Sequence, residues 1–218
     1  MREAVHLFFD LDGTLLDTQA DVCAEMAATL GALKLDPDRF FATFRLGPPL
    51  FQALREVYPE IDPQRADRFI AEFRERYDTS DYPETHPYPG IDALLRRAAH
   101  RGKKLFIATN KRYRPTVRLL EKFGWTELFT EVFAVDRFAE GPMSKVEMLR
   151  HGSVTPQTAV MIGDSASDIF AGKEAGFSTV AVSWGYEPVE KLAEALPDLL
   201  VPNVAELASA LGLEEISG

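Results

Sequence analysis

Two aspartates near the start of the chain, separated by one residue, are the first candidates for chemistry. Asp10 and Asp12 follow the apolar run Val5–Phe9 and precede Gly13. Alternate residues of a strand point to the same side, so both carboxylates can face one site, and Gly13 permits a sharp turn. Two negative charges this close are costly unless a cation offsets them, and a divalent metal ion is the usual partner. The alternative is a strand that ends in an aspartate-rich turn without a site.

Further polar residues stand just beyond other strand-like segments of the chain. These residues are Thr109, Asn110, Lys145 and Asp164. In an open parallel sheet, ligands bind outside the carboxyl ends of the strands. We therefore expect these residues to converge with Asp10 and Asp12 at one edge of a sheet, although they are far apart in the sequence.

The segments that must position these residues alternate between helix and strand after Gly90. Short apolar strands are predicted at residues 104–109, 132–135, 158–164, 178–183 and 199–201, with helical segments between them. Val5–Phe9, in which only His6 is polar, is typical of a strand buried on both faces. This alternation predicts an α/β fold with a doubly wound parallel sheet and right-handed crossovers.

Residues 18–82 have a different pattern, with roughly four helices and no strand. Apolar residues recur there at helical spacing, and Asp36-Pro37 and Asp62-Pro63 are typical helix starts. A proline-rich link follows, from Tyr82 to Gly90. We therefore expect an α/β core of residues 1–17 and 83–218, with a helical domain of residues 18–82 inserted after the first aspartates.

The motifs, taken in order, carry a family resemblance. The stretches Asp10–Thr14, Thr109-Asn110, Lys145 and Gly163–Asp168 resemble the four motifs of the haloacid dehalogenase superfamily, and the helical insert resembles its smaller helical cap. Arg45–Leu50 and Thr109–Lys111 are similar to stretches of the phosphoglycolate-phosphatase-like branch. The resemblance implies a Rossmann-like core and a Mg²⁺-dependent phosphatase. Such an enzyme hydrolyses a small phosphorylated metabolite, phosphoglycolate among the candidates, through an aspartyl-phosphate.

The resemblance also implies the roles of the acids. Asp10 would attack phosphorus, and Asp12 would protonate the leaving alcohol and then accept a proton from water. Mg²⁺ would bind the Asp10 side chain, the Asp12 backbone carbonyl and Asp164. Asp168, one helical turn after Asp164, would support the metal or hold Lys145.

The phosphate-binding residues implied by the resemblance are less specific. They are Thr109, Asn110 and Lys145. The family usually has proline after this lysine, whereas Val146 stands here, so a solvated helix lysine is the alternative. Other lysines within reach in the sequence are Lys103, Lys104 and Lys111. Arg45, beside a Gly-Pro-Pro break, is the cap residue we expect to meet a substrate anion; an arginine exposed to solvent is the alternative.

Three other functions are weighed against the phosphatase. A phosphosugar mutase of the same fold tends to carry valine where Thr14 stands, and a haloacid dehalogenase proper lacks the acid at Asp12. A non-catalytic partner-binding protein has no need of Asp10, Asp12 and Asp164 together. These comparisons favour the phosphatase, but they do not identify its substrate.

Composition excludes some partners. The formal net charge of −10 over 218 residues argues against nucleic acid and anionic membranes as partners, because both favour a basic surface. Cys23 is the only cysteine, so no intrachain disulfide can form and a reducing compartment is expected. No apolar stretch is long enough to span a bilayer or to act as a signal segment. We therefore expect a soluble cytoplasmic protein, whose oligomeric state the sequence does not predict.

Overall fold

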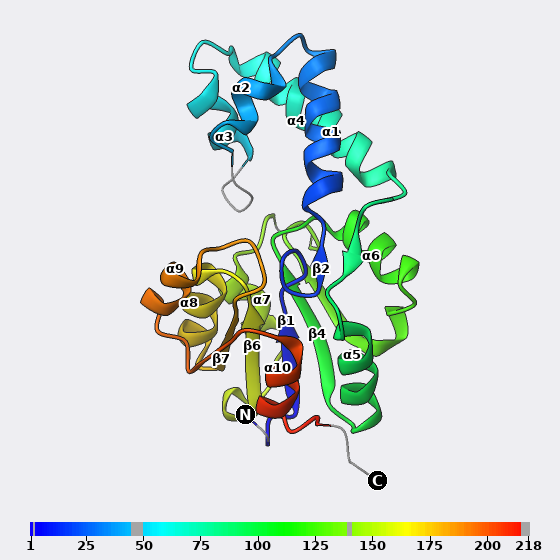
Figure 1. Cartoon of the computed structure of the whole chain (residues 1–218), viewed down its shortest axis with the longest axis vertical. Helices are drawn as coiled ribbons and strands as arrows, with labels where there is room; N and C mark the ends of the chain where they lie inside the picture. Colours follow the sequence, from blue (N-terminus) through cyan, green and yellow to red (C-terminus); the bar gives the residue numbers. More distant parts are fainter. Residues whose placement is uncertain (2, 45–49, 139–140, 215–218) are drawn as a thin grey trace. The chain divides into compact units, whose positions relative to one another are not determined.

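The computed structural model describes residues 1, 3–44, 50–138 and 141–214, which belong to two compact units (Figure 1). The sheet unit comprises Met1–Asp17 and His86–Gly218, and the helical unit comprises Thr18–Thr85. The helical unit ends at Thr85, and the sequence predicts the end of the helical domain at residue 82. Asp21 ties the two ends of this unit together, because its carboxylate accepts hydrogen bonds from the Glu84 N–H at 3.2 Å and the Thr85 hydroxyl at 2.6 Å.

The sheet unit is built on a six-stranded sheet in which all neighbouring strands are parallel. Its strands, in spatial order, are β5 (Phe129–Ala134), β4 (Lys104–Thr109), β1 (His6–Phe9), β6 (Ala159–Gly163), β7 (Ser178–Val182) and β8 (Leu199–Val201). The predicted fold class is confirmed. β5 begins earlier than expected, at Phe129, and carries the exposed Thr130 and Glu131 at the edge of the sheet.

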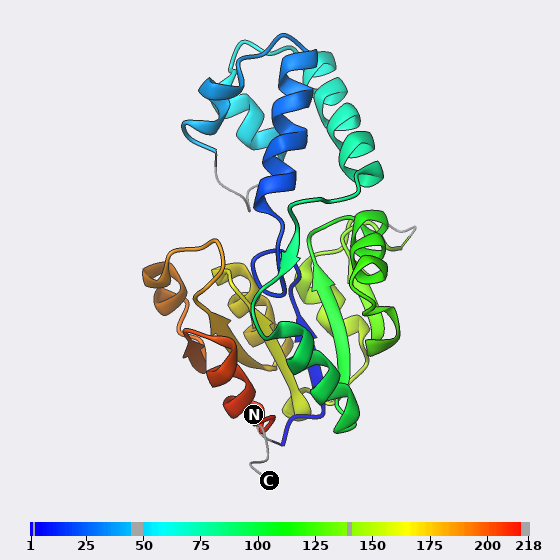
Figure 2. The same cartoon turned by 45° about the vertical axis from the view of Figure 1, so that its right-hand side comes forward.

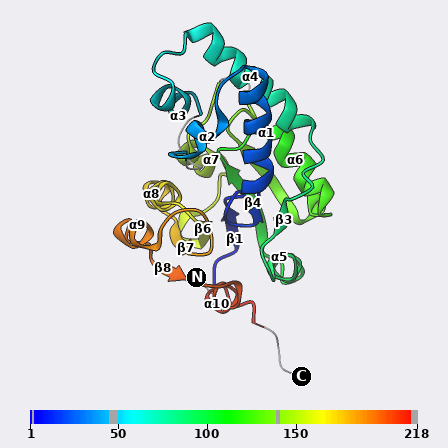
Figure 3. The ribbon, with the colours of Figure 1, turned by 45° about the horizontal axis from the view of Figure 1, so that its top comes forward.

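Helices cover both faces of this sheet. The register places Phe8 of β1 between Phe106 of β4 and Met161 of β6. The rings of Phe8 and Phe106 stack with centroids 4.4 Å apart. Met148 of α7 (Lys145–His151) and Ala171 of α8 (Ala166–Ala175) belong to the same buried cluster. α5 (Ile91–His100) and α10 (Val204–Ala210) lie together on the opposite face (Figure 3).

The described part of the sheet unit contains six further elements. They are β2 (Leu16–Asp17), β3 (His86–Pro87), α6 (Tyr113–Lys122), η1 (Thr126–Leu128), η2 (Pro156–Thr158) and α9 (Val189–Glu194). β2 and β3 pair antiparallel in a second, two-stranded sheet, on the segments that lead into and out of the helical unit. Across the described ranges, no helix combines the length and apolar character needed to cross a membrane.

The helical unit contains α1 (Gln19–Ala32), α2 (Pro37–Phe41), α3 (Leu50–Val57) and α4 (Pro63–Thr79), and α1 lies beside α4 (Figure 2). α4 begins as the sequence predicts: the Asp62 carboxylate accepts a hydrogen bond from the Arg65 N–H, and Pro63 occupies the first turn. Phe40 and Phe69 are fully buried and form the apolar centre of this unit.

Candidate active site

Asp10 stands directly after β1, and the sheet itself positions it. Its backbone N–H donates to the Ile162 carbonyl of β6 at 2.9 Å, so it continues the parallel ladder by one residue. The chain then folds back within a few residues, and the Gly13 N–H bonds the Leu16 carbonyl at 2.8 Å. Gly13 has φ +83°, and a Cβ there would lie 2.2 Å from Asp164 Oδ2. Only glycine allows this turn to pack directly on the Asp164 carboxylate.

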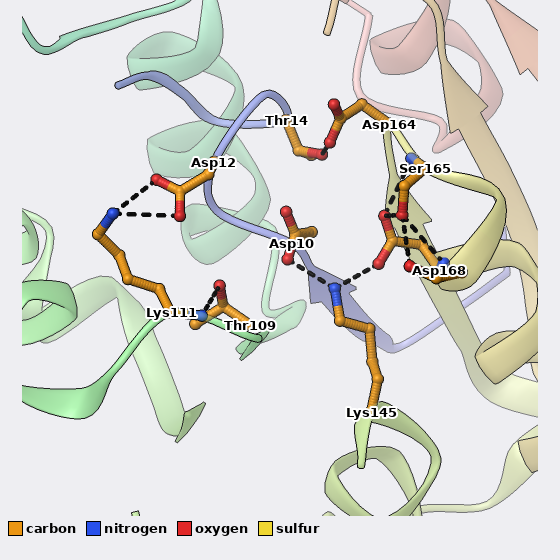
Figure 4. A network of polar contacts seen from close by, with 10 residues as sticks. Asp10, Asp12, Thr14, Thr109, Lys111, Lys145, Asp164, Ser165 and Asp168 are labelled. Atoms are coloured by element: carbon orange, nitrogen blue, oxygen red, sulfur yellow. Dashed lines mark hydrogen bonds and ion pairs between the residues drawn. The ribbon is translucent and has the colours of Figure 1, made fainter. Parts of the chain in front are cut away.

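Asp164 follows β6 and is held from two sides. The Thr14 hydroxyl donates to its Oδ1 at 3.0 Å (Figure 4). The Tyr186 backbone N–H donates to its Oδ2 at 2.8 Å. Gly185 lets the loop that carries Tyr186 approach Asp164, because a Cβ there would lie 2.3 Å from the Asp164 side chain. The carboxylate is thus fixed by loops that follow two other strands, β1 and β7.

Lys145 lies between the carboxylates of Asp10 and Asp168 (Figure 4). It is the first residue of α7, whose start is fixed by a capping box between Ser144 and Glu147. Its Nζ donates to Asp10 Oδ1 at 2.7 Å and to Asp168 Oδ1. Its side chain is only 8% exposed. The structure therefore places this lysine among the acids rather than in solvent, even though Val146 follows it.

Asp168 serves the site and its own helix together. Its Oδ2 accepts hydrogen bonds from the Ser165 N–H at 3.1 Å and the Ser165 hydroxyl at 2.7 Å, which completes the capping box at the start of α8. Its Oδ1 faces Lys145. Two other lysines that the sequence placed within reach do not join these acids. Lys103 Nζ donates to the Ala4 carbonyl, and Lys104, the first residue of β4, is exposed.

Two buried carboxylates, those of Asp10 and Asp168, contact the ammonium group of Lys145, and the third buried carboxylate, that of Asp164, lies close to them. Burial raises the pKa of Asp10 well above its ordinary value, and the nearby acids add to the rise, while Lys145 opposes it. Burial and the charge of Asp168 raise the pKa of Asp164 to about 6. Burial alone would lower the pKa of Lys145, but attraction to Asp10 and Asp168 outweighs it and raises the pKa above its ordinary value.

The same three acids fit a divalent cation. Ligand oxygens of Asp10, Asp164 and Asp168 lie within 4.8 Å of one another, and all three residues are buried. Carboxylate oxygens are the ligands that hard cations such as Mg²⁺ prefer. Burial raises the pKa of Asp10 and Asp164, repulsion from neighbouring acids adds to the rise, and a second positive charge would offset that repulsion.

Asp12 lies apart from this triad and faces a different lysine (Figure 4). Lys111 Nζ donates to Asp12 Oδ1 at 2.9 Å and to Oδ2 at 3.1 Å. Thr109, the last residue of β4, is buried, and its hydroxyl accepts the Lys111 N–H at 3.1 Å. Asn110 is exposed in the bend that follows. The topology thus brings the ends of β1 and β4 together, as expected for a parallel sheet.

Some site residues were not singled out by the sequence. Lys111 was part of the Thr109–Lys111 resemblance and one of the lysines within reach, but it had no assigned role, and neither had Gly185 or Tyr186. Their signal was position: each follows a parallel strand, β4 or β7, at its carboxyl end. The predicted substrate contact Arg45 lies outside the described residues.

Comparison with known proteins agrees with this geometry. The model of the family described as haloacid dehalogenase-like hydrolase matches residues 7–182. A phosphoglycolate phosphatase from Agrobacterium fabrum is 35% identical over 217 residues, covering 93% of this chain and 90% of that protein. The pyrophosphatase PpaX of Listeria monocytogenes is 32% identical over 213 residues, covering 96% of this chain and 97% of that protein.

A solved structure shares the fold. The haloacid dehalogenase-like family hydrolase from Streptococcus pneumoniae superimposes with a TM-score of 0.82 at 23% identity, covering 96% of this chain and 99% of that one. The resemblance seen in the four motifs is therefore confirmed over almost the whole length of the protein. The chain belongs to the haloacid dehalogenase-like hydrolase family.

Proposed function

We propose that the protein is a Mg²⁺-dependent phosphatase that hydrolyses a small phosphorylated metabolite through an aspartyl-phosphate. One observation carries the proposal: the buried Asp10 carboxylate is held by Lys145 beside two more buried acids, at the carboxyl end of a parallel sheet. This arrangement joins a positioned nucleophile, a fixed cation and a set of ligands for a divalent metal ion. Phosphoryl transfer needs these three elements.

In the first step, the Asp10 carboxylate attacks phosphorus, and the bond from phosphorus to the leaving oxygen breaks. Asp12 gives its proton to that oxygen. In the second step, Asp12 takes a proton from water, which attacks phosphorus and releases Asp10 and inorganic phosphate. Asp12 suits this alternating role because its side chain is 28% exposed, against 10% for Asp10, so it can meet both the leaving group and water.

Other residues of the site bind and orient. We assign Asp10, Asp164 and the Asp12 backbone carbonyl as the Mg²⁺ ligands, with Asp168 holding Lys145 beside them. Bound Mg²⁺ would neutralise the charge on the phosphoryl oxygens and polarise the phosphorus centre. The Thr109 hydroxyl, which accepts from Lys111 N–H, retains its own proton to donate to a phosphoryl oxygen.

The proposed substrate class follows from the relatives and from the chemistry. One relative is named for phosphoglycolate and the other for pyrophosphate, and the two substrates share only a terminal phosphoryl group. The core residues described above address that shared group. Phosphoglycolate is the first ester to test.

The test separates the two aspartates. The purified chain is assayed for released phosphate with ethyl phosphate and p-nitrophenyl phosphate, with Mg²⁺ or with EDTA. Asp10→Asn should be inactive on both esters while still folded. Asp12→Asn should lose about 10²- to 10⁴-fold on ethyl phosphate, which needs a proton on its leaving group, and much less on p-nitrophenyl phosphate, which does not.

Asp198→Asn is the matched control, since Asp198 is an exposed carboxylate outside the site, and it should keep wild-type activity. Equal losses on the two esters would show that Asp12 is not the leaving-group acid. Full activity in EDTA would contradict the metal requirement. Transfer of the phosphoryl group within a sugar phosphate, without net phosphate release, would favour the mutase instead.

A further inference from the structure

A second cation stands beside the residue that we assign as the leaving-group acid. Lys111 Nζ lies 2.9 and 3.1 Å from the two carboxylate oxygens of Asp12. Its side chain is 6% exposed, whereas that of Asp12 is 28% exposed. Lys111 is therefore nearly buried, whereas the carboxylate that it contacts is partly exposed.

This lysine is separate from the one that holds the nucleophile. Lys145 comes from α7 and bonds Asp10 and Asp168, whereas Lys111 comes from the loop after β4 (Figure 4). Each cation thus accompanies one of the two catalytic aspartates. Lys145 belongs with the phosphoryl group under transfer, and Lys111 with the side from which the leaving group departs.

The distances set what Lys111 can recognise. The leaving oxygen must come within hydrogen-bond reach of Asp12, which places it about 6 Å or less from the Lys111 ammonium. An anionic group a few bonds beyond that oxygen would meet the negative charge of Asp12. The ammonium of Lys111 offsets this repulsion and adds an attraction of its own. A neutral leaving group gains nothing from it.

We infer that Lys111 selects substrates whose leaving group carries a negative charge, such as a carboxylate or a second phosphoryl group. The inference rests on the proposed function, because it uses Asp12 as the leaving-group acid. Phosphoglycolate and pyrophosphate, which appear in the names of the two relatives, both meet this requirement. One unit charge at about 5 Å, with an effective dielectric constant of about 20 to 40, corresponds to roughly fifteen- to three-hundredfold in kcat/KM.

The experiment compares two esters that differ in one group. Phosphoglycolate and 2-hydroxyethyl phosphate have the same chain length, but the first carries a carboxylate where the second carries a hydroxymethyl group. The full chain is assayed with Mg²⁺ for phosphate release from each, and kcat/KM is measured. The kcat/KM of wild type should be at least about tenfold higher for phosphoglycolate than for 2-hydroxyethyl phosphate.

Variants then test the charge. Lys111→Met and Lys111→Gln remove it and should bring the preference close to one, mostly through loss on phosphoglycolate. Lys111→Arg keeps it and should retain most of the preference. Lys104→Met removes the same charge from the exposed first residue of β4 and should leave both rates unchanged. Circular dichroism and thermal unfolding establish that each variant is folded.

Equal losses on both esters in the neutral variants would overturn the inference, since Lys111 would then only orient Asp12. Equal rates of wild type on the two esters would overturn it as well. If wild type releases phosphate from neither ester nor from p-nitrophenyl phosphate, the proposed function fails, and the inference fails with it. Turnover of p-nitrophenyl phosphate without any preference between the alkyl esters contradicts only the inference.

Discussion

Replacing Asp164 by asparagine should stabilise the metal-free protein while removing its response to Mg²⁺. Asparagine has nearly the same shape as aspartate and can keep both local contacts. Its carbonyl oxygen can accept from the Tyr186 N–H, and its amide can donate to the Thr14 hydroxyl, which rotates to accept. The substitution therefore removes a buried charge and leaves the packing almost unchanged.

The size of the effect follows from the pKa of Asp164, which is raised from 3.8 to about 6 by burial and by Asp168. A rise of about two units corresponds to about 3 kcal/mol. Between pH 4 and 6 the folded state holds a proton that the unfolded state releases, so the free energy of unfolding decreases as the pH rises. The full penalty is present well above pH 6. Asp164→Asn should then be up to about 3 kcal/mol more stable than wild type at pH 8, but only about 1 kcal/mol more stable at pH 4.5.

Urea denaturation in EDTA measures this difference. Trp125 and Trp184 both belong to the sheet unit, so their fluorescence reports the unfolding of the unit that contains Asp164. Asp198→Asn is the matched control, because Asp198 also accepts from a backbone N–H and a threonine hydroxyl but is exposed. The control should show no gain at pH 8.

Adding Mg²⁺ at pH 8 completes the experiment. At a concentration one hundred times its dissociation constant, the ion should stabilise wild type by about 2.7 kcal/mol and stabilise Asp164→Asn much less. The reasoning is refuted if the variant is no more stable than wild type in EDTA at pH 8, or if its gain is the same at pH 4.5. A Mg²⁺ response equal to that of wild type would show that Asp164 is not a ligand.

Two further substitutions test the packing that supports the site and the helical unit. Gly13→Ala should cost about 1–3 kcal/mol and abolish the Mg²⁺ response, because its Cβ would lie 2.2 Å from Asp164 Oδ2 at a positive φ. Gly102→Ala, also at a positive φ but with open space around it, should keep the response, and equal behaviour of the two would contradict the argument. Asp21→Ala should destabilise the helical unit by about 2–4 kcal/mol, because it removes bonds to the Thr85 hydroxyl and a backbone N–H. Faster proteolysis of the segment around Thr85 checks this, and an unchanged rate would count against it.

The sequence predicted those features of the fold that depend on local pattern. An uninterrupted apolar run marked β1 as a buried strand, and Asp62-Pro63 marked the start of α4. The start of β5 was predicted less accurately. An edge strand exposes part of its length, and the polar Thr130 and Glu131 interrupt the apolar run by which a strand is identified. The two-residue strands β2 and β3 are too short to leave any pattern.

The order of the strands predicts which residues of the candidate site come together, but not the contacts between their side chains. Strand ends indicated which residues gather at one edge of the sheet, and the resemblance offered Asp168 as a partner of Lys145, but neither indicated which lysine contacts Asp10 or Asp12. That depends on where long side chains reach across the fold: Lys145 bonds Asp10 from 135 positions away, and Lys111 bonds Asp12 from 99 positions away. The role of Arg45 stays a prediction from the sequence.

The arrangement of charge suggests why one scaffold serves relatives with different substrates. Proteins named for phosphoglycolate and for pyrophosphate match this chain over nearly its whole length, and we propose that the part of the site they share binds the phosphoryl group. In the proposed mechanism that part is the buried half, where Lys145 holds Asp10 and Asp168. Discrimination must then come from groups near the leaving oxygen. In the proposed mechanism these groups are Asp12 and Lys111, and a change of charge there is expected to alter substrate choice without disturbing the nucleophile.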